Sequence, residues 1–234
     1  MVSREHTTEA EHASEAEYAS EPEHAREPEH AGGEEAAARW TQSTVYPDMW
    51  VDPDDDPRET EDPRGTDGEP LDERGLLLDY LRAYRLTLEM KCAGLDAEQM
   101  ARRSVPPSTM SLLGLVRHLT EGERHFRRVM AGEDAPKLYR TDEDRDGDFN
   151  GAVADQAVVD EAWRQWRTEV ERTDRYLAGV TDLGTHNAGH SDLGPEPGGQ
   201  HQLRDVLLAQ IAEYARHCGH ADLLRERVDG RVGQ

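Results

Sequence analysis

The stretch that decides the fold runs from Ser108 to Gly132 and reads "STMSLLGLVRHLTEGERHFRRVMAG". Its apolar side chains return every three or four residues, which is the spacing along one face of an α-helix. The stripe consists of Leu112, Leu115, Val116 and Leu119. Serines precede the stripe and can cap the first helical turn, and the final glycine can stop the last turn. The stretch therefore predicts one long amphipathic helix.

Three more stretches show the same period. One spans residues 73–94, and another spans residues 156–179 with Asp155 placed to cap it. The last begins near Leu203 and continues to about Val228. Because no part of the chain alternates as a strand does, we expect an all-α protein. Four such helices bury their stripes in an antiparallel-looking four-helix bundle around one core, with the order of connections left open.

The connections between these helices are polar. Residues 133–154 are acidic and rich in turn-forming residues, so we expect a loop there. A glycine-rich loop over residues 182–200 separates the last two helices. Neither connection contains a motif that identifies a substrate pocket.

The first 72 residues differ from the rest in composition and charge. They hold 22 acidic and 5 basic residues, which gives −17 of the chain's formal net charge of −23. Residues 9–32 form an imperfect six-residue repeat, "EAEHASEAEYASEPEHAREPEHAG". Such a segment repels itself and has little apolar surface to bury, so we expect residues 1–72 to be a largely disordered acidic tail and residues 73–234 to fold. Residues 40–50, "WTQSTVYPDMW", are apolar enough to dock on the folded part.

The composition also narrows the partners and the compartment. The chain is acidic and has no basic stripe, which argues against nucleic acid as a partner. No apolar run is long enough to span a bilayer and no signal peptide is evident, so we expect no membrane partner and a cytoplasmic location. The two cysteines, Cys92 and Cys218, are too few for a disulfide scaffold and should stay reduced.

A group of polar residues interrupts the apolar pattern of the last helix in "EYARHCGH", residues 213–220. At about 100° per residue, Glu213, His217 and His220 fall within roughly 60° of one another on the helix circumference. The same face continues in Val206 and Leu224, so the polar groups should lean toward the interior of the bundle. A buried carboxylate or imidazole without a partner costs free energy, and a metal ion is one partner that removes this cost.

His118 interrupts the apolar stripe of the helix predicted over residues 108–132 in the same way. Two ligands four residues apart on one helix, completed by one ligand from another helix, make a three-ligand site for zinc or a similar divalent ion. Three protein ligands leave a coordination position open, as in catalytic sites. Two other interpretations stay open: His118 as a core histidine satisfied by protein groups, and Glu213 as the ion-pair partner of Arg216 or Arg117.

Other candidate ligands are placed less well. His125 lies about 10 Å further along the helix than His118, so both cannot bind one ion, and we expect it to be solvated. His186 and His190 are also four residues apart, but they fall in the glycine-rich loop. The thiol of Cys218 points away from the face of its neighbour on the helix, so we expect it to pack and not to act as a nucleophile.

The segments "SLLGLVRHLTEGE" and "LRDVLLAQIAEYARHCGHADLLRERVDG" together resemble the DinB/YfiT-like superfamily of four-helix metalloenzymes, and especially its actinobacterial branch of mycothiol-dependent transferases. The resemblance covers about residues 73–230. It implies that His118, Glu213 and His217 bind a divalent metal, with zinc as the expected ion. Glu213 stands where the superfamily usually has a histidine. Mycothiol-dependent maleylpyruvate isomerase has a similar pairing of a glutamate with a histidine. His220 takes the place of the usual glutamine and would support a ligand or replace one.

The resemblance also implies a reaction. A low-molecular-weight thiol such as mycothiol would be activated for attack on an electrophile, so that the expected partners are a small-molecule thiol and an electrophile, with a homodimer as a possible assembly. One alternative is a metal-dependent hydrolase of amides or esters with Glu213 as the base. Another alternative is a non-catalytic metal-binding bundle that acts through partners.

Overall fold

The computed structural model describes residue 58 and residues 71–190 and 199–231. These residues form four long helices and two short ones, and no strand of a sheet occurs among them. The long helices are α3 (Glu73–Cys92), α5 (Leu112–Ala131), α7 (Gln156–Gly179) and α8 (Leu203–Asp229), and the short ones are α4 (Ala97–Ala101) and α6 (Gly147–Asn150). The prediction of an all-α four-helix fold is therefore confirmed.

Two sequence predictions lie outside this description. Residues 1–57 and 59–70 are not among the described residues, so the expected disorder of the acidic tail stays a prediction. The same holds for the docking of residues 40–50. The boundary expected at residue 73 coincides with the first residue of α3, whereas its role as a domain boundary stays a prediction.

The helices begin and end where side chains can satisfy the free backbone groups of a helix terminus. The Asp72 carboxylate accepts a hydrogen bond from the amide of Gly75 at 2.6 Å, and the Ser111 hydroxyl accepts one from the amide of Gly114 at 3.1 Å. Asp155 caps α7 in the same way, as the sequence predicted. Gly132 ends α5 at a φ of 65°, a left-handed conformation that glycine adopts without steric cost.

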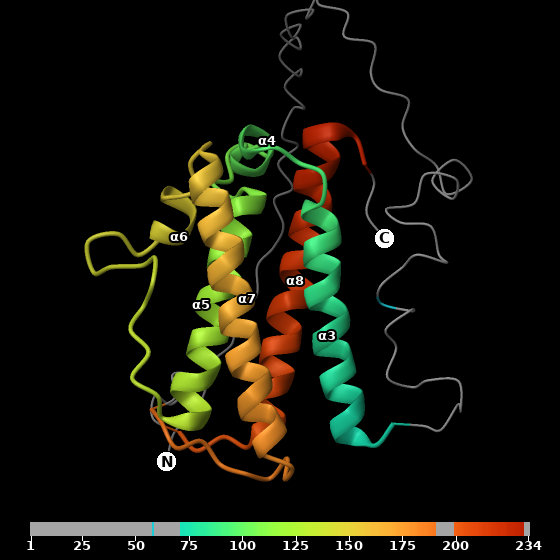
Figure 1. Cartoon of the computed structure of the whole chain (residues 1–234), viewed down its shortest axis with the longest axis vertical. Helices are drawn as coiled ribbons and strands as arrows, with labels where there is room; N and C mark the ends of the chain where they lie inside the picture. Colours follow the sequence, from blue (N-terminus) through green and yellow to red (C-terminus); the bar gives the residue numbers. More distant parts are fainter. Residues whose placement is uncertain (1–57, 59–70, 191–198, 232–234) are drawn as a thin grey trace, which may run out of the picture. The chain divides into compact units, whose positions relative to one another are not determined.

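The expected loop over residues 133–154 needs one correction, because it contains α6. This single turn packs against α5 (Figure 1), and its residues Gly147 and Asp148 are buried. Local propensity could not predict it, since the turn is stabilised by contacts with α5 and not by its own sequence.

α5 is the central helix of the bundle. It packs against α7, α8 and α6, while α3 packs mainly against α8 (Figure 1). In Figure 1, α5 and α7 descend together and α3 and α8 ascend together, so the long connection between α5 and α7 returns along the bundle. The antiparallel-looking arrangement is therefore right for α5 against α8 and wrong for α5 against α7 and for α3 against α8. None of the helices within the described ranges has an apolar stretch suited to crossing a bilayer.

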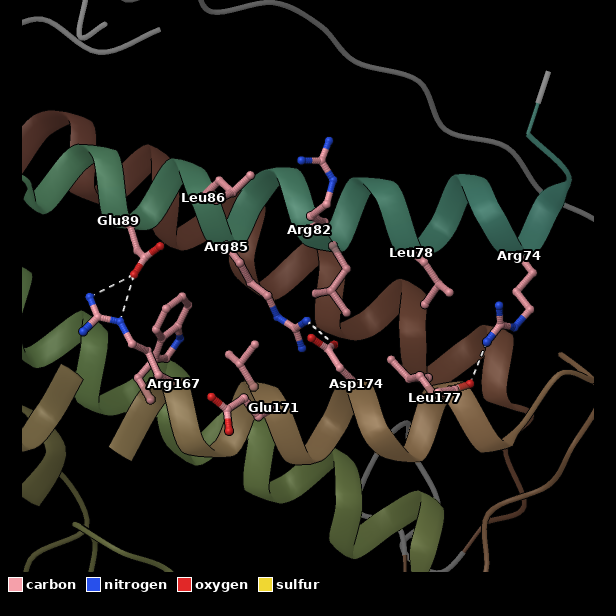
Figure 2. A pocket seen from close by; sticks show the side chains of 14 residues that line it. Arg74, Leu78, Arg82, Arg85, Leu86, Glu89, Arg167, Glu171, Asp174 and Leu177 are labelled. Carbon is pink, nitrogen blue, oxygen red and sulfur yellow. Dashed lines mark hydrogen bonds and ion pairs between the residues drawn. The ribbon is translucent and has the colours of Figure 1, made fainter. Parts of the chain in front are cut away.

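α3 and α7 face each other across an apolar groove of about 630 Å³ (Figure 2). Polar contacts bridge the groove along its length. Arg74 donates to the carbonyl of Leu177 at 2.6 Å, and an ion pair of 2.7 Å joins Arg85 to Asp174. A third contact, between the side chains of Arg167 and Glu89, closes the other end at 3.1 Å. The cations that reach across this groove thus have anionic or carbonyl partners on its opposite wall.

A buried network of polar side chains lies beneath the groove and joins all four long helices. Arg85 donates two hydrogen bonds to the carboxylate of Glu123, at 2.9 and 2.8 Å. The Tyr214 hydroxyl donates to the same carboxylate at 2.7 Å and accepts from the indole N–H of Trp166 at 2.9 Å. Because every member is buried and partnered, the network specifies how the four helices pack.

We expect Tyr214→Phe to lower the free energy of unfolding by about 2 kcal/mol, because it leaves a buried indole N–H without an acceptor and removes one donor to a buried carboxylate. Urea denaturation followed by circular dichroism measures the change. Tyr84→Phe is the matched control, since the Tyr84 hydroxyl forms no hydrogen bond within the described part of the chain. Equal stability of the two variants would contradict the role of the network.

Candidate metal site

Three side chains from α5 and α8 meet near the start of α5. The Oε1 atom of Glu213 lies 3.0 Å from Nε2 of His118 and 3.1 Å from Nε2 of His217. One ligand atom from each residue falls within 4.8 Å of the other two. His217 is buried, and His118 and Glu213 are half-buried. The structure therefore brings together the three residues that the sequence predicted as metal ligands.

The spacing of these atoms suits a divalent ion. Two ligands that each lie about 2.0–2.1 Å from a tetrahedral zinc ion are about 3.3 Å apart. The Glu213 oxygen lies 3.0 and 3.1 Å from the two Nε2 atoms, and all three ligand atoms lie within 4.8 Å of one another. The donor set of two imidazoles and one carboxylate is also one that zinc and similar ions accept. The cluster could thus hold a metal with small side-chain adjustments.

Asp148 of α6 fixes the orientation of His118. Its Oδ2 atom lies 2.8 Å from Nδ1 of His118, on the side of the ring opposite Glu213. The same oxygen accepts a hydrogen bond from Arg140 Nε at 3.0 Å. A carboxylate on Nδ1 holds the imidazole in the tautomer that leaves Nε2 free to bind a cation, which is the usual environment of a metal-binding histidine.

Two features of α5 hold α6 in place. Arg117 donates from Nε to the carbonyl of Asp148 at 2.8 Å and from Nη2 to the carbonyl of Gly147 at 3.0 Å. Gly114 provides space for Phe149, because a Cβ atom at this position would lie 2.6 Å from the Phe149 ring. The Phe149 ring in turn stacks on His118, with ring centroids 5.4 Å apart. Arg117 therefore positions α6 and is not the ion-pair partner of Glu213.

Arg216 does pair with Glu213, as one of the open interpretations expected. Its Nη1 atom lies 2.7 Å from Oε2 of Glu213, whereas both histidines contact Oε1. The ion pair and the histidine cluster thus use different oxygens of one carboxylate. The structure accommodates both interpretations of Glu213.

His220 stands behind His217. The two Nδ1 atoms lie 3.2 Å apart, so one ring donates a hydrogen bond to the other. Burial, together with the nearby charges of His217 and Arg216, lowers the pKa of His220 from its ordinary value. His220 does not belong to the three-residue cluster. Its contact with His217 would allow the supporting role that the resemblance implies, and that role stays a prediction.

The electrostatics of the cluster follow from its hydrogen bonds. Contacts with His118 and His217 lower the pKa of Glu213 well below its usual range. Burial alone would lower the pKa of His118, but the hydrogen bonds that the ring donates to the Asp148 and Glu213 carboxylates outweigh this effect and raise the pKa above 6.5. Burial would raise the pKa of Asp148, yet its bond to His118 and the charge of Arg140 lower it below 3.8. Each carboxylate is therefore ionised and poised to attract a cation.

The remaining sequence candidates lie away from the cluster. His125 is half-buried and accepts a contact from Arg128 at 3.3 Å, so the expectation that it is solvated is only partly right. His186 forms an isolated bridge with Gln202, and no contact joins it to His190 within the described residues. Cys218 is buried, and its Sγ atom lies 3.5 Å from the carbonyl of Tyr84. The expectation that Cys218 packs is confirmed.

Sequence reasoning missed Asp148 and Arg140. Asp148 is one of several acidic residues in the connection between α5 and α7, and nothing in its spacing distinguishes it from its neighbours. The signal that could have found it is Phe149, an aromatic residue in an otherwise polar segment that had to pack somewhere.

Comparison with known families adds a finding to this geometry. The family model described as Mycothiol-S-transferase matches residues 76–230. The matched range covers more than half of the chain and contains all three residues of the cluster, together with Asp148 and His220. A search of curated proteins gave no match.

We expect the metal-free protein to show a pH-dependent stability that Asp148→Asn removes in part. The raised pKa of His118 means that its contribution is complete below pH 6.5 and is lost as the pH rises through the folded-state pKa. The lowered pKa of Asp148 means that its contribution is present above pH 3.8 and is lost as the pH falls through the folded-state pKa. The pair therefore stabilises most between these two values.

Nuclear magnetic resonance titration of the His118 ring measures the coupling directly. Its pKa should fall in Asp148→Asn, because the carboxylate acceptor on Nδ1 is lost. The ring signals of His190, a histidine outside the cluster, serve as the internal control. A His118 pKa that is the same in both proteins would show that Asp148 does not act on it.

Proposed function

The chain belongs to the mycothiol S-transferase family, as its sequence resemblance indicated, and we propose from this premise that it is a metal-dependent thiol transferase. In this proposal, His118, Glu213 and His217 hold a divalent ion, with zinc as the favoured element. The thiol is mycothiol or a similar low-molecular-weight thiol, and its sulfur is transferred to an electrophilic substrate. The observation that carries the proposal is the convergence of two Nε2 atoms on one carboxylate oxygen from two different helices.

The charges at this site are compatible with a divalent ion. Two ionised carboxylates, Glu213 and Asp148, flank His118, and a side-chain cation pairs with each of them. An ion of two positive charges bound by Glu213 would add to this balance in a half-buried setting where a charge is costly without partners. When bound to three protein ligands, such an ion lowers the pKa of a thiol in its open position.

The chain's own residues would perform the remaining tasks. Asp148 keeps His118 in one tautomer, and His220 orients His217 through the contact of their Nδ1 atoms. Nη2 of Arg140 lies 3.4 Å from Nδ1 of His118, and Nε of Arg140 donates a hydrogen bond to the Asp148 carboxylate. These supports fix two of the three ligands before any ion binds, which lowers the entropic cost of forming the site.

The nucleophile would come from outside the chain. The protein has two cysteines, and burial raises the pKa of both thiols to about 12. At neutral pH, Cys92 and Cys218 are therefore protonated and enclosed, so neither is suited to attack a substrate. A free small-molecule thiol is the remaining source of the sulfur.

We predict that the purified chain retains about one divalent ion, and that His118→Ala and Glu213→Gln lose it. Asp148→Asn should weaken zinc binding by about tenfold or more, because His118 loses the carboxylate that orients it. Plasma mass spectrometry measures the content, and competition with a chelator measures the affinity. His125→Ala, on the same helix but outside the cluster, should bind zinc as the wild type does. Retention of zinc by His118→Ala would refute the proposed ligand set.

We predict that the zinc-loaded protein consumes an alkyl halide only when mycothiol is present. His118→Ala and His217→Ala should abolish this consumption, whereas Cys218→Ser should keep it because its thiol is buried and protonated. Release of halide ion measures the rate. Zinc binding without any thiol consumption would favour the non-catalytic bundle, and cleavage of esters without thiol would favour the hydrolase.

A further inference from the structure

A cavity of about 500 Å³ lies between α5, α8 and the connection that follows α5, and two of its lining residues are His118 and Glu213. A substrate held there would lie next to the proposed metal site. The class of that substrate can be inferred on the premise of the proposed function. The charges of the lining decide which class fits.

The cavity is lined by more positive than negative side chains. The cations are Arg128, Lys137, Arg140 and Arg216, and the anions are Glu121 and Glu213. This lining contrasts with residues 73–234 as a whole, which carry a net charge of −6 because residues 1–72 hold −17 of the chain's −23. A cavity lined by one sign of charge raises the local concentration of ligands of the opposite sign.

Groups of the protein offset part of the negative charge of the two anions. Glu213 pairs with Arg216 and both histidines. Glu121 is buried, and its Oε1 atom accepts hydrogen bonds from the amides of Leu138 and Tyr139, at 2.6 and 2.7 Å. Glu213 and the Oε1 atom of Glu121 are thus satisfied by groups of the protein itself, whereas the buried Oε2 atom of Glu121 has no hydrogen-bond partner among the described residues.

These contacts with Glu121 also fix the segment that contains Lys137. Arg124 donates to the carbonyl of Pro136 at 3.1 Å, and Arg128 donates to the carbonyl of Ala135 at 2.9 Å. The backbone on both sides of Lys137 is therefore tied to α5. A cation on an anchored segment binds an anion at a lower entropic cost than one on a free loop.

Lys137 differs from the other three cations in having its charge available. Arg140 pairs with Asp148, Arg216 pairs with Glu213, and Arg128 donates to a carbonyl. Lys137 is exposed and forms no hydrogen bond or ion pair within the described ranges. The groove between α3 and α7 is the contrast, because its bridging arginines Arg85 and Arg167 are paired with acids of the opposite helix (Figure 2).

Gln210 of α8 supplies a second, uncharged donor. It lines the cavity and is buried, and its Nε2 atom has no acceptor among the described residues. A buried amide N–H without an acceptor costs free energy, which a carboxylate oxygen within reach would recover.

We propose that this cavity binds an electrophile through an anionic group, so that the preferred substrates are carboxylate-bearing electrophiles and Lys137 is the main residue that selects for the charge. For an alkyl halide that carries a carboxylate, the thiol sulfur forms a bond to the halogen-bearing carbon. The carbon–halogen bond breaks, the halide leaves with the bonding electrons, and the thiol proton passes to the solvent. The carboxylate is not changed by the reaction and serves only for binding.

Equilibrium binding of benzoate and benzamide tests the proposal without any reaction. The two probes share one ring and nearly one size, but only benzoate is charged. Titration calorimetry on the full chain, both zinc-loaded and metal-free, should show that benzoate binds several-fold more tightly in both forms and that added salt weakens only benzoate. Lys137→Gln should weaken benzoate binding by about twofold to fivefold and leave benzamide unchanged. Arg175→Gln, an exposed arginine of α7 outside this cavity, is the matched control.

Three results would overturn the proposal. One is equal affinity for benzoate and benzamide, and another is benzoate binding that Lys137→Gln does not change. The third is a preference for benzoate seen only with zinc bound, which would place the carboxylate on the metal.

Turnover of para-bromomethylbenzoate and its amide with mycothiol separates this inference from the proposed function. Each rate is divided by the uncatalysed rate with the same thiol, and the acid should show the larger ratio in the wild type but not in Lys137→Gln. Selective benzoate binding without turnover of either compound would refute the thiol transferase and leave the anion site standing. Equal turnover of acid and amide would support the transferase and refute the anion site.

Discussion

The contact of the Glu213 carboxylate with the two imidazoles of His118 and His217 is the interaction on which the site depends. It joins the start of α5 to the middle of α8, and each partner would be costly to bury alone. A divalent ion bound by these three residues, as proposed, would displace protons from the imidazole rings. Its binding would then be coupled to proton release, and its affinity would depend on pH.

Hydrogen bonds on two sides hold the residues of this contact in position. Arg117 holds the backbone of α6, and α6 presents Asp148 to the outer nitrogen of His118. On the other side of α5, the buried network of Glu123 and Tyr214 fixes how α8 lies against α5. Tyr214 adjoins Glu213 in the chain. The network that sets the helix packing therefore also sets the position of the Glu213 carboxylate relative to α5. Stability and the geometry of the site thus depend on the same residues.

Periodicity predicted the four long helices and the face of α8 that holds Glu213 and His217, because both depend on local spacing. It could not predict that the opposite side of α5 is buried as well. Glu123, Arg124 and Arg127 lie outside the apolar stripe that the sequence showed, yet all three are buried, and both arginines pair with Glu169 of α7. That burial arises from contacts distant in sequence, as does the placement of Asp148, and a single sequence carries no local signal for either.

The same long-range contacts explain why a cationic cavity can exist in an acidic chain. Arg124 and Arg128 use backbone carbonyls of the connection after α5 as partners, and Glu121 uses backbone amides of the same connection. The connection thus folds back onto α5 through contacts that do not involve the Lys137 side chain. If it were free in solution, its many carboxylates would surround the site and repel an anionic substrate. The net charge of the chain therefore says little about its ligand, because the local field at the cavity is set by the few residues that the fold brings there.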